Sequence, residues 1–414
     1  MKVKKLRPIV LAGGSGKRLW PLSTKEKPKQ FISLFGDYSL FDLTLQRLNN
    51  ASLFKKPIIV TSKDYLPHIK DSYKRTGIEV EKVILEPESK NTFSAISLAT
   101  MMALIKDKEE DLLVAPSDHY LSNNQEFYNS IKKAASVVIN DGLILFGVKP
   151  SNPSTEYGYI QTNEERDEVY QVSNFVEKPS ASKAKSLLKK NNTFWNAGIF
   201  VFKGSWLMEA CKYEHKMSMV KIQDILPKKY PSDLYFIPDA EKFSYLLEAP
   251  FDKAFVEKNN NNIMLKLDAG WSDLGSWVAL SALQKDLKSQ MTLFEGNETI
   301  REEKPWGYFE TLMETSSSKV KLLSISPGHK LSLQKHRYRS ETWYVINGKA
   351  KVTKGNERYS MVAGDSVIIE ANEQHRLENI SETQLEIIEI QTGTYFGEDD
   401  IVRLKDSYGR EDLH

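Results

Sequence analysis

A glycine-rich segment near the amino terminus contains the first residues whose types suit phosphate chemistry. Gly13-Gly14-Ser15-Gly16 follows an apolar run directly, and Lys17-Arg18 comes next. Glycines allow backbone N–H groups to approach phosphate oxygens, and cations neutralise the charge that develops on a leaving pyrophosphate. A tight turn that binds no ligand is the alternative, and glycines alone do not separate the two interpretations.

Further cations favour the phosphate interpretation. Arg18 and Lys29 follow the turn, with more lysines between them. A P-loop needs Ser or Thr after its Gly-Lys pair, where this chain has Arg18. A dinucleotide-binding fold needs a third glycine where this chain has Leu19. The segment therefore indicates a nucleotide phosphate site of another kind.

Carboxylates later in the chain are candidates for holding a metal ion. Asp118 lies at the end of a predicted strand, where a carboxylate can hold magnesium. Taken alone, such an aspartate is more often a helix cap, and Asp268 or Asp273 a turn residue. His119 is more readily interpreted as structural than as catalytic.

A second candidate metal site occurs in the carboxy-terminal part. Gln334 and His336 are two residues apart and share a face of a predicted strand, whereas Glu341 needs a bend to join them. With His375 they form a mixed oxygen and nitrogen set that suits zinc or a similar ion acting as a Lewis acid. Taken alone, the pattern is more typical of scattered polar residues than of a metal site.

The elements that must position these residues change along the chain. Short β-branched runs at 8–12, 57–61, 82–85, 111–115 and 143–148 alternate with amphipathic segments, which predicts a parallel sheet with crossover helices. Such a doubly wound sheet binds ligands at the carboxyl ends of its strands. Asn91 or Thr92 is predicted to cap the helix that follows them.

The pattern of polar and apolar residues changes in the middle and at the end of the chain. Residues 151–285 are mixed and predict an extension of the first domain that adds a second wall to its cleft. From Lys304 onward, alternating polar and apolar residues predict an all-β barrel or sandwich, with a hairpin at Asn347-Gly348. The polar segment between the two is the predicted linker.

Length and composition exclude several classes of protein. The 414 residues suggest two or three domains, and 40% hydrophobic with 27% charged residues predict folded, globular units. The net charge of +2 argues against a nucleic-acid or membrane-surface binder, and no apolar run could span a bilayer. Cys211 is the single cysteine, which excludes an internal disulfide. We expect a cytoplasmic protein.

The complete first motif resembles the signature of sugar-1-phosphate nucleotidylyltransferases, and above all that of bacterial bifunctional mannose-1-phosphate guanylyltransferases. The resemblance rests on motifs that recur in one order along residues 8–280: Gly13-Gly14-Ser15-Gly16-Lys17-Arg18-Leu19-Trp20-Pro21-Leu22-Ser23, Pro28-Lys29-Gln30-Phe31, Glu86-Pro87, Asn91-Thr92, Pro116-Ser117-Asp118-His119, Phe175-Val176-Glu177-Lys178-Pro179, Asn196-Ala197-Gly198 and Asp268-Ala269-Gly270-Trp271-Ser272-Asp273-Leu274-Gly275. One departure is Lys90, where the family usually has arginine.

The carboxy-terminal part resembles the cupin domain of type II mannose-6-phosphate isomerases. The resemblance rests on Leu331-Ser332-Leu333-Gln334-Lys335-His336, Arg339-Ser340-Glu341-Thr342-Trp343 and the tail from Ile390 to Arg410. All four positions of that family's metal set are retained here as Gln334, His336, Glu341 and His375. Tyr338 and Thr342 stand where many members have histidine.

The resemblance implies a fold and a division into domains. The fold class is α/β: a Rossmann-like nucleotidyltransferase domain over residues 1–284, a linker at 285–303 and an all-β cupin barrel over 304–414. Relatives usually carry a small β domain between the tryptophan matching Trp277 and the motif Lys304-Pro305-Trp306-Gly307, and here only a short polar stretch joins the two. The resemblance therefore leaves homo-oligomer formation open.

The implied reaction is transfer of GMP from GTP to mannose 1-phosphate, which gives GDP-mannose, a precursor in polysaccharide biosynthesis. The cupin would add interconversion of mannose 6-phosphate and fructose 6-phosphate. One alternative is a nucleotidylyltransferase for another base or hexose 1-phosphate. Another is a cupin that serves as a non-catalytic binding module. The implied cofactors are Mg²⁺ at the transferase site and Zn²⁺ or another divalent ion in the cupin.

The resemblance also implies a role for each site residue. The catalytic set is Arg18, Lys29, Lys178, Asp118 and Asp273. The nucleotide set is Leu11, Ala12, Gly13, Gly14, Gly16, Pro87, Asn91, Thr92 and Ser117. The sugar-phosphate set is Gly158, Glu177, Lys178 and Asn196. Magnesium is assigned to Asp118 and Asp273, with Asp268 in reserve.

Overall fold

The computed structural model describes residues 4–14, 19, 23–35, 37–137, 142–275, 279–280, 301–314 and 317–409. The chain forms two compact units. Unit 1 contains residues 1–16, 25–32 and 38–273, and unit 2 contains 17–24, 33–37 and 274–414. Each unit has its own apolar core.

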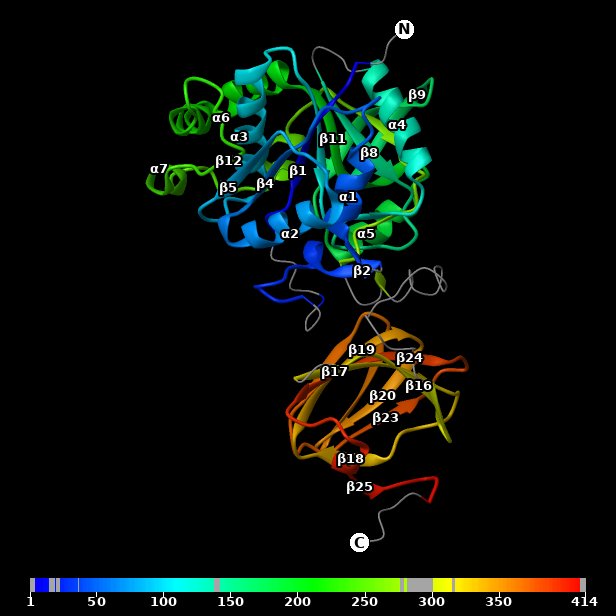
Figure 1. The fold of residues 1–414 in the computed structure, drawn as a ribbon. Helices are drawn as coiled ribbons and strands as arrows, with labels where there is room; N and C mark the ends of the chain where they lie inside the picture. The colour runs from blue at the N-terminus through cyan, green and yellow to red at the C-terminus, as the bar shows by residue number, and fades with distance from the viewer. Residues whose placement is uncertain are drawn as a thin grey trace. The chain divides into compact units, whose positions relative to one another are not determined.

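Unit 1 is built on a ten-stranded sheet with helices on both faces (Figure 1). The strand order is β12-β5-β4-β1-β6-β11-β8-β13-β10-β9. The five strands predicted from the sequence are confirmed, with bounds as follows: β1 Arg7–Leu11, β4 Ile58–Ser62, β5 Lys82–Glu86, β6 Asp111–Pro116 and β8 Leu143–Val148. The first four pair in parallel, so their carboxyl ends meet at one edge of the sheet.

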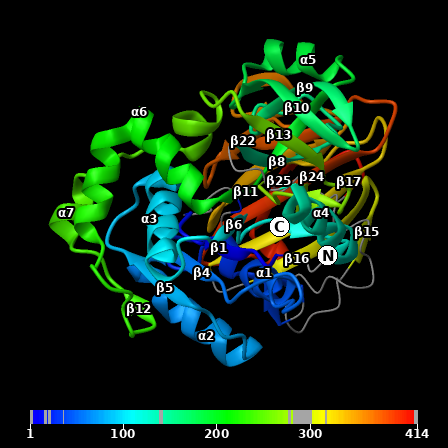
Figure 2. The same ribbon diagram turned by 90° about the horizontal axis from the view of Figure 1, so that it is seen from above.

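Alternation along the strands produces the two cores of unit 1. On β1, Ile9 contributes to one core and Val10 to the other, because successive side chains point to opposite faces. The helices of unit 1 are α1 Leu40–Leu48, α2 Leu66–Thr76, α3 Asn91–Lys106, α4 Asn124–Val137, α5 Ala181–Leu188, α6 Gly204–Ile225 and α7 Ala240–Ser244. The core of Ile9 lies beneath α3 and α6, which lie side by side (Figure 2), and the core of Val10 beneath α1, α2 and α4.

The strands of the middle region join this same sheet, so the region does extend the first domain but forms no separate layer. They are β9 Tyr159–Arg166, β10 Val169–Val176, β11 Thr193–Lys203, β12 Tyr235–Phe236 and β13 Asn262–Lys266. The five predicted strands run in one direction, but the whole sheet is mixed, because β10 runs antiparallel to β13 and β9, and β11 runs antiparallel between β6 and β8. Its alternating apolar residues pack on both faces, as a central position requires.

Short elements complete unit 1 near the carboxyl edge of the sheet. They are the single turns η2 Lys29–Phe31 and η3 Lys63–Tyr65, the π-helical turn η4 Asp252–Val256, and the two-residue strands β3 Tyr38–Ser39, β7 Tyr120–Leu121 and β14 Trp271–Ser272. The segment Ser33–Phe35, which is assigned to unit 2, is β2. The predicted helix cap is wrong: α3 begins after Lys90, and the Thr92 hydroxyl accepts a hydrogen bond from the Phe251 N–H instead.

The carboxy-terminal part consists of two facing β-sheets around an apolar core, as predicted. One sheet has the order β15-β16-β17-β24-β19-β22 and the other β21-β20-β23-β18-β25. The strands are β15 Arg301–Lys304, β16 Gly307–Glu314, β17 Ser318–Ile325, β18 Leu333–His336, β19 Arg339–Asn347, β20 Lys349–Lys354, β21 Glu357–Val362, β22 Ser366–Ile369, β23 His375–Asn379, β24 Leu385–Gly393 and β25 Ile401–Lys405. A single turn, η5 Glu398–Asp400, precedes β25.

Two predictions about this region are corrected. Asn347-Gly348 does not close a hairpin, because β19 and β20 belong to different sheets. Only Gly348 of the pair has a positive φ, +88°, whereas the tight hairpin turn of an Asn-Gly pair needs positive φ at both residues. Strand β15 begins at Arg301, inside the segment expected to be linker, and most of that segment lies outside the described residues.

No helix in the described ranges is long and apolar enough to cross a bilayer. Cys211 is buried and reduced in the core beneath α3 and α6. It therefore behaves as a packed apolar side chain.

Candidate functional site

The glycine turn begins at the carboxyl end of β1, where side chains from other segments hold it. The carbonyl of Ala12 accepts hydrogen bonds from Thr61 Oγ1 at 2.9 Å and Gln30 Nε2 at 3.2 Å, and Gln30 also donates to the Gly14 carbonyl at 2.9 Å. Leu11 is tied to the next strand because its carbonyl accepts from the Ser117 N–H. Gly16 and Arg18 lie outside the described residues.

A buried carboxyl group lies against this turn. A Cβ placed on Gly13 would lie 3.4 Å from Glu86 Oε2, so this carboxyl group lies close to the backbone of the turn. Burial raises the pKa of Glu86 to about 8. Its other oxygen, Oε1, is buried and has no hydrogen-bond partner within the described part of the chain. Such an oxygen is poised to bind a ligand.

Lys29 joins the two aspartates predicted to hold magnesium. Its ammonium lies 2.8 Å from Asp118 Oδ2 and also donates to the main-chain carbonyl of Asp273. Burial would raise the pKa of Asp118, but the charge of Lys29 and the hydrogen bond from its ammonium group outweigh this effect and bring that pKa to about 2. Asp118 is therefore an anion throughout the physiological range.

Two short strands place Asp273 beside Asp118. β7 pairs antiparallel with β14, which sets Ser272 opposite Tyr120. The Tyr157 hydroxyl donates to Asp273 Oδ1 at 2.7 Å and orients that carboxylate. Asp268 is exposed on the stretch between β13 and β14, and no described contact joins it to the other two aspartates.

His119 has a structural environment. Trp271 Nε1 donates to His119 Nδ1 at 3.2 Å, and the two rings meet edge to face at 5.4 Å. Burial lowers the pKa of His119, so the ring stays neutral at pH 7 and can accept this bond. The contact fixes the strand pair that carries Asp273.

The predicted nucleotide-base residues lie at the start of α3. Asn91 has φ +63°, a left-handed conformation that non-glycine residues rarely adopt, and its Oδ1 accepts from the Thr92 N–H at 2.9 Å. Thr92 is tied to Phe251 as described above. Pro87 follows β5 directly, beside Glu86, and Ser117 is buried at the end of β6. All these residues lie at the same edge of the sheet, the one formed by the carboxyl ends of its parallel strands.

The predicted sugar-phosphate residues converge beyond that edge. A Cβ placed on Gly158 would lie 2.7 Å from Glu177 Oε2 and 3.4 Å from Asn196 Cβ, so the three residues line one site. Lys178 has φ +45° and its ammonium lies 3.6 Å from Glu177 Oε1, with 57% of the side chain exposed. A strained backbone at a charged residue is typical of a functional position.

The sequence predictions missed Asp252, which completes this group. Asn196 Nδ2 donates to Asp252 Oδ1 at 2.7 Å. Burial, and then the charge of Glu177, raise the pKa of Asp252 to about 7. Asp252 begins the five-residue π-helix η4, a rare element that is frequent at functional sites. A run of five ordinary residues carries no sequence signal for such a turn.

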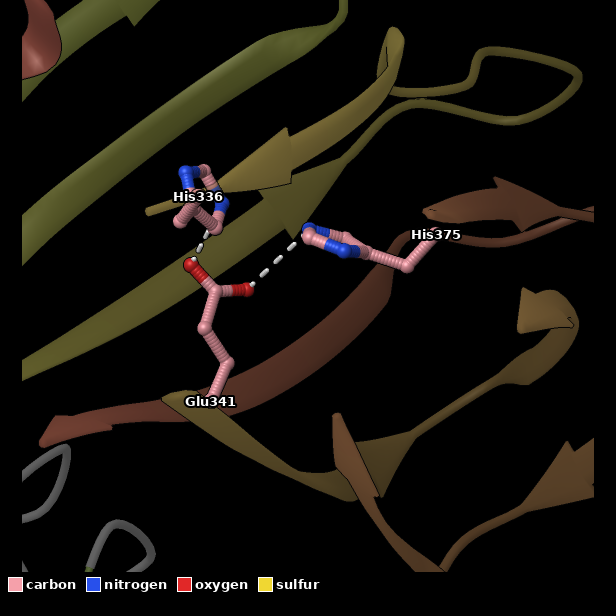
Figure 3. Close-up of side chains that lie close together, drawn as sticks. All are labelled: His336, Glu341 and His375. Atoms are coloured by element: carbon pink, nitrogen blue, oxygen red, sulfur yellow. Dashed lines mark ion pairs between the residues drawn. The ribbon is translucent and has the colours of Figure 1, made fainter. Parts of the chain in front are cut away.

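In the carboxy-terminal barrel, three of the four predicted metal ligands converge. His336 on β18, Glu341 on β19 and His375 on β23 point toward one another (Figure 3), and their candidate ligand atoms lie within 4.8 Å of one another. His336 Nε2 lies 3.0 Å from Glu341 Oε1, and His375 Nε2 lies 3.6 Å from Glu341 Oε2. All three side chains are buried.

The fourth predicted ligand lies next to them. Gln334 pairs with His375 across β18 and β23, so both side chains occupy one face of the sheet. Gln334 Oε1 already accepts from Ser332 Oγ at 2.7 Å. Tyr338, by contrast, is 57% exposed and contacts the Tyr395 ring, so it adds no phenol to this cluster.

The buried histidine nitrogens fit a metal ion. Among the described residues, His336 Nδ1 is buried with no hydrogen-bond partner, and His336 Nε2 and His375 Nε2 are buried facing Glu341 without the geometry of a hydrogen bond. Buried polar atoms without a good hydrogen bond lower the stability of the fold unless a ligand binds to them. Burial lowers the pKa of His375; burial would raise the pKa of Glu341, but the two histidines and Arg339 outweigh it and hold that pKa below its usual range. Neutral imidazoles and an ionised carboxylate are the forms that bind a divalent cation.

Two protein families match the chain. The Nucleotidyl transferase family matches residues 7–290, and the family described as Mannose-6-phosphate isomerase C-terminal matches residues 295–406. Among solved structures, a mannose-1-phosphate geranyltransferase from Thermus thermophilus has a TM-score of 0.59 at 26% identity over 72% of this chain and 81% of that one. A mannose-6-phosphate isomerase from Helicobacter pylori has a TM-score of 0.55 at 30% identity over 65% of this chain and 100% of that one.

Curated relatives match over nearly the whole length. Alginate biosynthesis protein AlgA of Pseudomonas aeruginosa is 30% identical over 97% of both chains. Xanthan biosynthesis protein XanB of Xanthomonas campestris pv. campestris is 31% identical over 97% of this chain and 99% of its own, and mannose-1-phosphate guanylyltransferase 2 of Escherichia coli O157:H7 is 31% identical over 98% of both. The chain belongs to the nucleotidyl transferase family, in the branch of mannose-1-phosphate guanylyltransferases that carry a mannose-6-phosphate isomerase domain at the carboxyl end.

Proposed function

We propose that the protein transfers GMP from GTP to mannose 1-phosphate, releasing pyrophosphate and GDP-mannose. The observation that carries this proposal is the junction at Lys29, which ties Asp118 to the main chain of Asp273 beside the glycine turn. A cation and two carboxylates at the carboxyl edge of a parallel sheet form a site for a nucleotide phosphate and its metal.

The reaction is an in-line attack of the sugar phosphate on the α-phosphorus of GTP. The attacking phosphate is already an anion, so no base is required, and positioning with charge neutralisation supplies most of the rate. Backbone N–H groups at residues 13–16, with Arg18 and Lys29, are assigned to the leaving pyrophosphate. Gln30 holds the turn that presents those N–H groups.

Magnesium binding is assigned to Asp118 and Asp273, with Asp268 in reserve. Two carboxylates are the hard oxygen ligands that Mg²⁺ takes, and the ion would neutralise charge on the nucleotide phosphates. The test is a magnesium titration of Asp118→Asn and Asp273→Asn. Both should need more magnesium and turn over more slowly, whereas Asp268→Asn should resemble the wild type. An unchanged magnesium dependence in the first two would refute the assignment.

The sugar phosphate is assigned to Lys178, and the hexose hydroxyls to Glu177, Asn196, Asp252 and Gly158. Lys178 is half exposed and free to move toward an anion, which suits a phosphate contact. Carboxylates and amides accept and donate hydrogen bonds to hydroxyls, so a buried set of both types can select one hexose stereoisomer.

Guanine is assigned to the site formed by Glu86, Pro87, Asn91, Thr92 and Ser117. Guanine presents two adjacent N–H donors on its pairing edge, where adenine presents only one together with an acceptor. Without a ligand the buried Glu86 carboxyl is mostly protonated at pH 7, and two N–H donors from guanine would favour its ionised form, which can accept from both. This supports GTP over ATP as the nucleotide.

A product assay tests the transferase. Purified protein is incubated with magnesium, each nucleoside triphosphate and each hexose 1-phosphate, and nucleotide sugars are measured. GTP with mannose 1-phosphate should give the highest kcat/KM. A higher value with another pair would establish the alternative, a nucleotidylyltransferase for another base or hexose.

We further propose that the cupin interconverts mannose 6-phosphate and fructose 6-phosphate with a divalent metal held by His336, Glu341, His375 and Gln334. Zn²⁺ suits this set of ligands, and as a Lewis acid it would polarise the oxygens on C1 and C2, the two carbons between which a proton is transferred. Coupled assays of fructose 6-phosphate formation by metal-loaded protein test the proposal. Metal bound without isomerisation would support the alternative, a cupin that only binds.

The two activities are assigned to separate domains, the transferase to residues 1–284 and the isomerase to the β-rich part that begins with β15 at Arg301. Products of the cupin would then supply the precursor of mannose 1-phosphate.

A further inference from the structure

A charged cavity in the barrel extends from the metal cluster to a pair of lysines. It is lined by Gln334 and Glu341 of the metal set, and also by Lys304, Lys321, Phe309 and Glu398. Lys304 belongs to the Lys-Pro-Trp-Gly motif that follows the linker. The reactions proposed above assign no function to this motif. The cavity therefore joins the metal set and this motif in one site.

The two ammonium groups converge on the same aromatic ring. Lys321 Nζ lies 4.0 Å from the centre of the Phe309 ring, and Lys304 Nζ lies 5.2 Å from it. The strands that carry them, β17 and β15, flank β16, which carries Phe309. Cations within about 6 Å of a ring face are held there by the ring quadrupole, so both charges are fixed at one end of the cavity.

Lys321 is unusually buried for a charged residue. Its side chain is 4% exposed, although lysine is rarely buried so fully unless it has a function or a close partner. Its partner is Glu398, whose carboxylate lies 3.3 Å away. Lys304 pairs with Glu302 at 3.0 Å, and Glu302 is not among the residues lining the cavity.

The charges lining the cavity are unevenly distributed. Four cations line it, namely Lys304, Lys321, Arg339 and Arg403, against the three carboxylates Glu341, Glu389 and Glu398. Glu341 belongs to the metal cluster, and Glu389 is bound to Gln391 Nε2 at 2.8 Å and to Trp343 Nε1 at 3.2 Å. Among the residues that line the cavity, cations therefore outnumber carboxylates by four to three, and Glu302 pairs with Lys304 from outside this lining.

We propose that Lys304 and Lys321 form the subsite that binds the phosphate of a sugar phosphate in the barrel, with the sugar carbon chain directed toward the metal cluster. A dianionic phosphate would take the place of Glu302 and Glu398 as the partner of the two ammonium groups, which would donate to its oxygens. Glu398 holds Lys321 in place when no phosphate is bound. This inference rests on the proposed isomerase function, and binding can be measured without turnover.

The test compares Lys304→Gln and Lys321→Gln with wild type by titration calorimetry. The ligands are mannose 6-phosphate and its unphosphorylated counterpart mannose, and saturating GDP-mannose keeps the transferase site filled. Lys351→Gln is the matched control, because Lys351 is an exposed lysine on β20 of the same barrel. Metal content and guanylyl transfer are measured for every variant to confirm intact folding.

Each cavity variant should bind mannose 6-phosphate at least about tenfold more weakly, because a charge-assisted hydrogen bond is lost. Lys321→Arg, which keeps the charge, should retain most of the affinity, and Lys351→Gln should equal the wild type. Wild-type affinity in both cavity variants, an equal loss for mannose, or no binding by the wild type would overturn the proposal. Binding that depends on both lysines without isomerisation would support the subsite and reject the isomerase function alone.

Discussion

At the residue scale, Lys29 is the side chain on which the transferase site depends. It is 4% exposed and connects two segments that are more than a hundred residues apart. A buried ammonium that already bonds to a carboxylate has its position fixed before substrate arrives, so no reorganisation is needed when charge develops on the pyrophosphate.

We predict that Lys29→Ala reduces kcat/KM for GDP-mannose synthesis about a hundredfold, because removing one transition-state charge contact costs on the order of 3 kcal/mol. Arg18→Ala should have a similar effect. The control is Lys25→Ala, since Lys25 is exposed on the same segment. The measurement is pyrophosphate release by variants whose circular dichroism matches the wild type. Near-normal release by folded Lys29→Ala would remove the assigned role.

A second prediction at the residue scale concerns Glu86 and the pH dependence of the free energy of unfolding. Its pKa is raised to about 8 in the folded chain, above the ordinary value of 4.5, so ionising it in the fold is unfavourable. The penalty is absent below pH 4.5, grows as the pH rises and is complete above about pH 8. Glu86→Gln should therefore raise the free energy of unfolding at pH 8, by on the order of 4 kcal/mol, and leave it nearly unchanged at pH 4.

The same variant should lose its preference for GTP over ATP, because the amide cannot accept from both guanine donors. Denaturant unfolding at the two pH values and kcat/KM for both nucleotides are the measurements. A variant that gains no stability at pH 8, or keeps the full preference for GTP, would contradict this account of Glu86.

Much of the site was predictable at this scale, and the exceptions have physical reasons. Asp118 and Asp273 lie in motifs with a distinctive order, so their approach through Lys29 follows from the topology of the sheet. Asp252 escaped prediction because its bond to Asn196 is made across 56 residues and its π-helical turn has no sequence pattern. Gln30 was part of a motif, but only the structure reveals that its side chain holds the glycine turn.

At the element scale, the strands of the first half were predictable and their order was not. Periodicity identifies a strand but not its neighbours, and β11 enters the sheet antiparallel between β6 and β8. That insertion has a function: it places Asn196, near the start of β11, next to Gly147 of β8 and close to Gly158 before β9. The proposed sugar site thus includes a residue from a strand that the parallel pattern does not predict.

The prediction at the element scale concerns Gly158, which directly precedes β9. A methyl group there would lie 2.7 Å from Glu177 Oε2 and 2.8 Å from Phe175 Cζ, both tighter than normal contacts. We expect Gly158→Ala to push Glu177 aside and raise KM for mannose 1-phosphate about tenfold or more, as a misplaced substrate contact would. The KM for GTP should stay unchanged, which serves as the internal control. A proportional rise in both constants would show general damage and not a sugar contact.

At the scale of the whole molecule, the chain combines two folds with separate cores and separate candidate sites. The relatives align over 468 positions, more than the 414 residues present here, so they carry residues that this chain lacks. This fits the short connection predicted between Trp277, which lies outside the described residues, and the barrel. Shortening the connection leaves the ligands of both sites in place.

Separate cores predict that the two sites can be inactivated independently. His336→Ala with His375→Ala should abolish the bound divalent metal, because two of three converging ligands are removed, and isomerisation should disappear with it. Guanylyl transfer should remain within about twofold of the wild type, since no ligand of the transferase is changed. The control is His329→Ala, which removes a barrel histidine that stacks on Tyr408 outside the cluster. Metal analysis and both activity assays on the full-length chain are the measurements, and unchanged metal content in the double variant would disprove the site.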